Sequence, residues 1–342
     1  WVAKYIFSYS TGAHTALAGD AFFGDFIGSN FQPVFWQVLF VLASFFIVVR
    51  GGKNGIEKAS RILMPLLVVL TIIITIFSIT RPGAWEGVKY YFIPDFSKLS
   101  TNTILAALGQ MFYSMSLAMG IMITYGSYLR KQDDIEKSVS MIELFDTGIA
   151  FLAGLMIVPA VFAFQGPENL AQGPKLMFVT LPKVFESMWM GGFVGCLFFI
   201  LVLFAALTSA ISLMEAVTST VCDQFLLSRK RSAVVVTVCT ILLGIPSALG
   251  YGVWENFTIL GMSILDFVDF LTNSVLMPVT AFLTCIFVAY IIGVKAIDEE
   301  VEISSEFKRK KLFEIMIKYI APICILAILI SSILNSFGVI TL

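Results

Sequence analysis

The sequence predicts an all-α polytopic membrane protein, and three observations lead to this class. Of the 342 residues, 58% are hydrophobic, and the mean hydropathy is +0.92. Charged residues make up 13% of the chain, about half the share usual in soluble domains. The apolar residues gather in long segments, and about 20 such residues cross a bilayer as one helix.

Eight apolar segments follow one another along the chain. Their approximate bounds are 34–49, 60–80, 103–128, 144–165, 193–225, 232–250, 262–293 and 313–333. Residues 1–11 are too short to span a membrane and resemble the last turns of a helix begun upstream. We therefore expect a chain that lacks its amino-terminal spans, and we recognise no signal peptide in it.

The positive residues alternate between the loops on either side of these segments. The loops at 50–61, 130–137, 229–231 and 295–318 contain sixteen of the 22 Lys and Arg residues. The loops at 12–33, 81–102, 166–192 and 251–261 together contain five. Because basic loops stay in the cytoplasm, we expect the first set to be cytoplasmic and the carboxyl terminus to be extracytoplasmic. We expect a multi-pass protein of the plasma or inner cell membrane.

Three connecting segments have features of their own. The outer loop 81–100 mixes aromatic residues with Pro and Gly, which suits a cap at the membrane interface. The outer loop 166–190 carries apolar patches between prolines, and long loops of this kind often act as lids. Residues 301–311 form a charged amphipathic linker before the final apolar segment.

The segment Leu108 to Tyr128 is apolar enough to span, but its centre is polar and rich in small residues. Gln110 and Ser114 are four residues apart and share a helix face, and Ser116 follows. A broken membrane helix needs such a centre if its freed carbonyls are to hold an ion. Alternatively, the small residues only allow two helices to pack closely.

A polar stripe lies along segment 193–225. Thr208, Ser212, Glu215 and Ser219 are spaced by four, three and four residues, and Ser209 lies beside them. Serine and threonine hydroxyls in helices often just bond the carbonyl four residues before them. That explanation does not cover Glu215, because an acid within the membrane needs a partner.

Two more acidic groups have two interpretations each. If the helix of segment 144–165 starts near Ser138, Asp146 lies well inside the membrane; if the helix starts at Asp146, this residue is an ordinary N-cap. Asp266, Asp269 and Asn273 share a helix face near the outer end of segment 262–293. They form a solvated rim, or one of them pairs with a cation from outside the chain.

The residue types exclude several classes of site. The single histidine, His14, has no second ligand beside it, and the five cysteines are scattered without a C-x-x-C pair. No nucleophile–base pair, phosphate-binding loop or haem motif is present, so we do not expect an enzyme. A net charge of −1 gives no sign of nucleic-acid binding. Oxygen groups on four helices suit a hard monovalent cation, which indicates a transporter or channel.

Three stretches resemble a known family. GQMFYSMSLAMG followed by ITYGSYLRK, residues 109–131, resembles the sixth helix of the sodium-coupled neurotransmitter and amino-acid symporters, which have the leucine-transporter fold. LFAALTSAISLMEAV, residues 203–217, is similar to the eighth helix of that family. RGGKNGIEKASRILMPLL, residues 50–67, resembles its junction between helices four and five. The resemblance covers essentially the whole chain.

The resemblance implies one transmembrane domain made of two inverted five-helix repeats around a site at mid-membrane depth. The chain would hold the end of helix three through helix eleven, without helices one and two. Residues 1–100 would be the remainder of the first repeat, 101–293 the second repeat, and 294–342 the cytoplasmic linker and helix eleven.

Carried over by position, the resemblance also implies site residues, with two sodium sites in the full-length protein. The first sodium site would use Ser114 and Asp146, and the second the Ala205 carbonyl, Thr208 and Ser209. The outer gate would use Asp269, with Gln110 as its neighbour. The substrate positions would be Tyr113, Ser114, Ser116, Met119, Ser209 and Leu213.

Two positions depart from the family pattern. Ala118 stands where members often carry glycine, so the helix break has one glycine fewer. Ala150 stands where chloride-dependent members carry serine and many bacterial members an acid. Because Asp146 brings a fixed negative charge to the sodium ion, an added anion would be repelled, and we do not expect a chloride requirement.

These expectations combine into a sodium-coupled symporter, in the lipid bilayer, of a small zwitterionic solute. Because Tyr113, Met119 and Leu213 are aromatic or apolar, a hydrophobic amino acid is favoured. One alternative is a membrane receptor or regulator that binds sodium and solute without turnover. Another is a sodium-coupled transporter of a different small organic solute. No feature assigns an oligomeric state.

Overall fold

The computed structural model describes residues 1–164 and 173–338, and these fold into helices. Six helices in this part of the chain are long and apolar enough to cross a membrane. They are Gly55–Ile79, Ile135–Phe164, Gly191–Phe225, Arg229–Leu249, Ile264–Glu302 and Lys310–Ser336. A further span arises if Ala21–Ile27 and Gln32–Val48, which are bent by 76° to each other, are counted as one. The predicted multi-pass helical architecture is confirmed.

Two of the eight predicted segments differ from a single long helix. Segment 34–49 is helix α4 (Gln32–Val48), which at 17 residues is slightly short for a span. Segment 103–128 is divided into α7 (Thr101–Ser114) and α8 (Ile121–Gly126). The other six predicted segments each coincide with one of the long helices.

The chain forms two compact units. The first contains residues 1–94 and 148–265, and the second contains residues 95–147 and 266–342. One boundary falls inside helix α9 (Ile135–Phe164), between Thr147 and Gly148. The predicted division into repeats at residues 100 and 293 stays a prediction.

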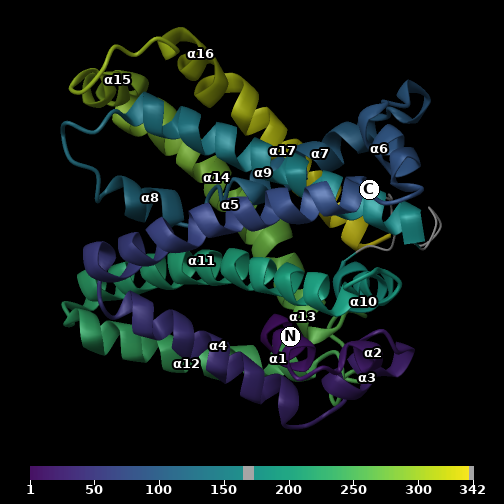
Figure 1. Ribbon diagram of the computed structural model, residues 1–342. Coiled ribbons are helices and arrows are strands. Elements are labelled where there is room, and N and C mark those ends of the chain that lie inside the picture. Colours follow the sequence, from purple (N-terminus) through teal and green to yellow (C-terminus); the bar gives the residue numbers. More distant parts are fainter. Residues whose placement is uncertain (165–172, 339–342) are drawn as a thin grey trace. The chain divides into compact units, whose positions relative to one another are not determined.

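Helix α11 (Gly191–Phe225) is the centre of the first unit. It packs against α1 (Val2–Ser10), α4, α5 (Lys58–Ile79) and α12 (Arg229–Leu249), and Figure 1 shows it between α5 and the pair α4 and α12. The shorter helices of this unit are α2 (His14–Leu17), α3 (Asp20–Ile27), η1 (Gly52–Glu57), α6 (Ala84–Phe92), η4 (Leu176–Thr180) and α10 (Leu181–Glu186).

An aromatic core holds the predicted lid loop against the first unit. Tyr5, Phe178 and Phe199 are buried with their rings in contact, and the Tyr5 hydroxyl donates to the Phe178 carbonyl at 2.7 Å. In α10, Leu181 and Val184 are buried in the same core. Residues 176–185 of the loop are therefore buried or half-buried against the protein, whereas 173–175 are exposed; the first part of the loop, 166–172, lies outside the described residues.

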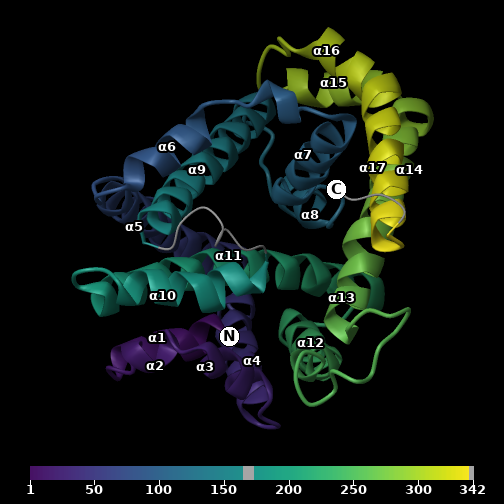
Figure 2. The same ribbon diagram turned by 90° about the vertical axis from the view of Figure 1, so that its right-hand side faces the viewer.

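The second unit is organised around α14 (Met277–Ile286) and α17 (Ala321–Ser336), which lie side by side (Figure 2). Helix α17 also contacts α7, and Phe112 of α7 is buried with Met277 and Ile325. The remaining helices that lie wholly or mainly in this unit are η2 (Phe96–Lys98), α8, α13 (Ile264–Asp269), η5 (Phe270–Leu276), η6 (Phe287–Gly293), α15 (Val294–Glu302), α16 (Lys310–Ile315) and η7 (Met316–Ile320).

Candidate functional site

The helix break between α7 and α8 is produced by left-handed backbone at alternate residues. Ser116, Ala118 and Gly120 have φ values of +53°, +62° and +77°. Such residues cannot continue a right-handed helix, and the conformation is costly for Ser116 and Ala118 because they carry a Cβ atom. Strained backbone of this kind is typical of functional sites. The structure thus has the broken helix that one interpretation of this segment predicts.

Asp146 lies beside the start of this break. Its Oδ1 atom accepts a hydrogen bond from the Ser114 hydroxyl at 2.8 Å, and the Asp146 side chain is half-buried. Helix α9 begins at Ile135, eleven residues before Asp146. The interpretation of Asp146 as an N-cap is therefore wrong. Asp134 caps the helix instead, because its carboxylate accepts the Lys137 backbone N–H at 2.9 Å.

The Ser114–Asp146 pair has the chemistry of a cation site. The serine hydroxyl uses its proton to bond Asp146, which leaves its oxygen lone pairs available. The carboxylate adds a formal negative charge, and the adjacent break frees backbone carbonyls that a continuous helix would use. Oxygen ligands of these kinds suit a hard cation such as sodium.

The polar stripe of α11 belongs to the first unit. The Thr208 hydroxyl donates to the carbonyls of Phe204 at 3.0 Å and Ala205 at 2.9 Å, as expected for a helical threonine. Ser209, one residue on, is exposed and makes no side-chain hydrogen bond within the described chain. The Ala205 carbonyl, the Thr208 hydroxyl and the Ser209 hydroxyl thus present three oxygens within one turn of α11.

Glu215 has the partner that its position requires. Its carboxylate is fully buried and accepts two bonds from the Arg229 guanidinium, one of them 3.1 Å from Nη1 to Oε1. The same guanidinium donates to the Val48 carbonyl from Nη2 at 2.8 Å and from Nε at 3.2 Å. One arginine therefore joins α11, α12 and the end of α4.

The other predicted substrate and gate residues are divided between the units. In the second unit, Gln110 and Tyr113 are exposed on α7, while Ser116 and Met119 lie half-buried in the break. In the first unit, Leu213 is exposed on α11 close to Ser209. Asp269, at the end of α13, accepts a hydrogen bond from Asn273 Nδ2 at 2.5 Å, so these two residues form a local pair as their spacing indicates.

Sequence reasoning missed two sets of partners. It counted Arg229 only as one of the basic residues of a loop, although a buried acid on the preceding helix was a signal for it. It also treated residues 301–311 as a charged linker, without pairing them with the acids around the start of α9. The structure brings Ser305, Lys308 and Arg309 against those acids.

Comparison with known proteins gives a consistent result. The profile of the sodium:neurotransmitter symporter family matches residues 28–339. An uncharacterized sodium-dependent transporter of Haemophilus influenzae is 35% identical over 97% of this chain and 74% of its own length. One of Bacillus subtilis is 34% identical over the whole chain and 75% of its own length. The crystal structure of MhsT in complex with L-phenylalanine has a TM-score of 0.86 at 40% identity, covering 97% of this chain and 76% of MhsT.

Proposed function

Because this chain belongs to the sodium:neurotransmitter symporter family, we propose that the protein imports hydrophobic amino acids by sodium symport. The family consists of sodium-coupled transporters rather than enzymes. The observation that carries the proposal is the Ser114–Asp146 hydrogen bond beside the broken helix. At this point a carboxylate, a hydroxyl and the backbone carbonyls freed by the helix break lie together, and these are the residues at which the family resemblance implies the first sodium ion.

A second sodium ion is assigned to the three oxygens of Ala205, Thr208 and Ser209 on α11. The Ser209 hydroxyl supports this assignment because it has no competing bond in the described chain. Thr208 supports it because its hydroxyl, although it donates to two carbonyls, retains its oxygen lone pairs. We propose two sodium ions per cycle and no chloride requirement, with an extracytoplasmic carboxyl terminus in a plasma or inner membrane.

The solute is proposed to be a hydrophobic amino acid. Tyr113, Met119 and Leu213 are aromatic or apolar, and a methionine adapts to several side-chain shapes. The similar MhsT structure contains L-phenylalanine, which supports the same solute class. We propose breadth among hydrophobic amino acids, taken up by alternating access in which sodium and solute bind one state preferentially.

Uptake by the full-length protein in proteoliposomes tests this function. Labelled L-phenylalanine should accumulate under an inward sodium gradient and should not accumulate when potassium or choline replaces sodium. In a competition panel of the twenty amino acids, hydrophobic side chains should compete best. Undiminished uptake without sodium would reject the coupling, and preference for Lys, Glu or glycine would reject the solute class. Binding without counterflow would favour the receptor alternative.

A further inference from the structure

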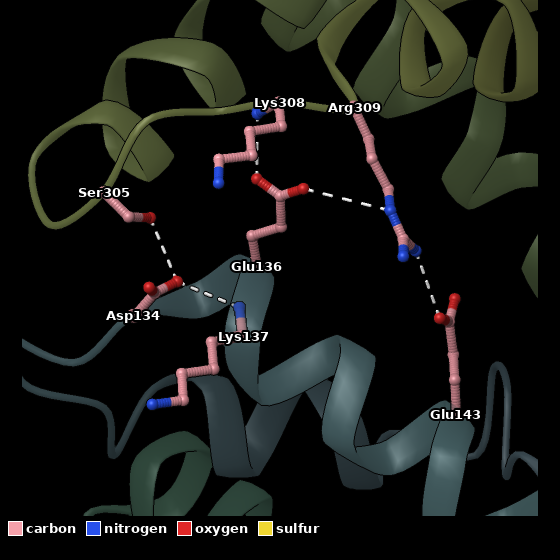
Figure 3. Close-up of polar contacts among 7 residues, drawn as sticks. All are labelled: Asp134, Glu136, Lys137, Glu143, Ser305, Lys308 and Arg309. Atoms are coloured by element: carbon pink, nitrogen blue, oxygen red, sulfur yellow. Dashed lines mark hydrogen bonds and ion pairs between the residues drawn. The ribbon is translucent and has the colours of Figure 1, made fainter.

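The start of helix α9 is tied to the linker between α15 and α16, and both belong to the second unit (Figure 3). Asp134, the capping residue of α9, accepts the Ser305 hydroxyl at 3.0 Å as well as the Lys137 backbone N–H. Both hydrogen bonds stabilise the ionised carboxylate, and they hold the pKa of Asp134 below its ordinary value; the bond from the Lys137 backbone N–H has the larger effect. The linker is therefore anchored to a carboxylate that is charged at neutral pH.

Arg309 extends the anchor to two further acids on the same face of α9. Its Nη1 atom lies 3.2 Å from Glu143 Oε2, and its Nε atom lies 4.0 Å from Glu136 Oε1. The backbone N–H of Lys308 donates to Glu136 Oε2 at 2.9 Å. Glu136 and Glu143 are seven residues apart, close to two helical turns. One guanidinium thus lies between two acids that are about two turns apart on α9 (Figure 3).

This arrangement differs from an isolated surface ion pair. Such pairs contribute little because two flexible, solvated side chains must be held in one geometry. The Arg309 and Glu143 side chains are 54% and 48% exposed, so their pair alone would be of that kind. The Glu136 side chain, however, is only 17% exposed; it accepts the Lys308 backbone N–H and lies within ion-pair distance of Arg309. With the Asp134–Ser305 bond, the linker contacts α9 at three acids. The contacts therefore define both the position of α9 along its axis and the face that it turns to the linker.

The same helix carries Asp146, three residues beyond Glu143. Because residues three apart lie on neighbouring positions of one helix surface, a rotation or shift at Glu143 moves Asp146 with it. The 2.8 Å bond between Asp146 and Ser114 leaves little tolerance for such a movement. We propose that Arg309 is a positioning residue for Asp146 and that the 303–309 linker thereby sets sodium affinity. This inference rests on the proposed function of Asp146 as a sodium ligand.

The test compares Arg309→Gln with Lys311→Gln in the full-length protein. Lys311 carries the same charge two residues away, and its side chain makes no bond within the described chain. In proteoliposomes, Arg309→Gln should raise the sodium concentration for half-maximal L-phenylalanine uptake about three- to tenfold, as for other couplings transmitted through a structure. The maximal rate at saturating sodium should be retained, Arg309→Lys should recover part of the loss, and Lys311→Gln should match the parent.

A second readout does not depend on transport. Sodium that binds the folded protein raises its Tm in a concentration-dependent way, so purified protein in detergent reports sodium affinity directly. Glu143→Gln should shift this dependence in the same direction as Arg309→Gln and by no more, because Arg309 also lies near Glu136. The double variant should shift it no further than Arg309→Gln alone, because Arg309→Gln already removes the contact with Glu143. Glu143→Gln also supplies the test if Arg309→Gln does not fold.

The possible outcomes separate the inference from the function on which it rests. If Arg309→Gln and Glu143→Gln show the sodium dependence of the parent, the inference is overturned. It is also overturned if Lys311→Gln produces an equal shift, which would indicate a general effect of charge. If the parent itself shows no sodium-dependent uptake and no sodium-dependent Tm, the proposed function fails instead.

Discussion

The Ser114 hydroxyl donates a hydrogen bond to the Asp146 carboxylate across 2.8 Å, linking the end of α7 to the interior of α9. The two residues are 32 positions apart in the chain, so no local preference brings them together. A hydroxyl aligned by a carboxylate at the point where a helix breaks is a preorganised set of oxygens. The predictions about sodium begin from this pair.

Replacing Asp146 with Asn should weaken sodium activation while keeping the size of the side chain and an acceptor for Ser114. Asn lacks the negative charge, and the Coulomb attraction between a carboxylate and a sodium ion about 4 Å apart is roughly 4 kcal/mol at an effective dielectric constant of about 20, so the sodium concentration for half-maximal uptake should rise about tenfold or more. Sodium titration of uptake at a saturating amino-acid concentration measures this. Asp133→Asn, in the loop before α9, serves as the control because its partner is Arg130.

The same variant tests the charge balance of the site. Replacing chloride with gluconate should leave uptake by the parent intact, since an anion beside ionised Asp146 would be repelled. Asp146→Asn removes that repulsion, so its uptake should become responsive to chloride. A parent that needs chloride would contradict the role of Asp146 as the fixed negative charge.

Thr208 and Thr220 provide a matched pair on α11. Both hydroxyls donate to the carbonyl four residues before them, at 3.0 Å for Thr208 and 2.9 Å for Thr220. Thr208→Ala should reduce sodium affinity several-fold, because the ion would lose one of the oxygen ligands proposed for it. Thr220→Ala should leave the sodium titration unchanged. Equal behaviour of the two variants would mean that Thr208 has only the ordinary helical role.

The Arg229–Glu215 pair should matter for stability. Arg229→Gln leaves a fully buried carboxylate without its cation, and breaking a buried pair costs about 3–5 kcal/mol. Thermal unfolding in detergent should show a marked fall in Tm. The control is Arg61→Gln, which removes the ion pair between Arg61 and Glu57. The Arg61 and Glu57 side chains are 76% and 54% exposed, so this variant should change the free energy of unfolding by less than about 1 kcal/mol.

Two substitutions in the helix break should have opposite effects on the stability of the protein. Ala118→Gly should be neutral or stabilising, because it removes a Cβ from a left-handed residue whose cost is about 1–2 kcal/mol. Gly120→Ala should be destabilising by about 1–2 kcal/mol, since it introduces that cost at φ +77° even though no atom of the described residues lies within 4 Å of the new Cβ. Comparing the Tm of both variants with that of the parent checks the signs.

The transmembrane character of the chain could be predicted because it depends on local properties. The hydropathy of a segment such as 193–225 requires a helix in a bilayer wherever that segment lies, and α11 spans almost the same residues. The cost of burying Glu215 likewise follows from its residue type. The sequence therefore located the long helices and identified the acid that needed a partner.

The choice of partner was decided only by the tertiary structure. Arg229 also bonds the Val48 carbonyl, 181 residues away in the chain, and no spacing pattern encodes such a contact. The start of α9 depended on whether Asp134 or Asp146 caps it, and either aspartate satisfies the local rule. At Ser116 and Ala118 the backbone adopts a conformation that both residue types disfavour. Such a conformation persists only where surrounding contacts compensate its cost, and those contacts form when distant segments pack together.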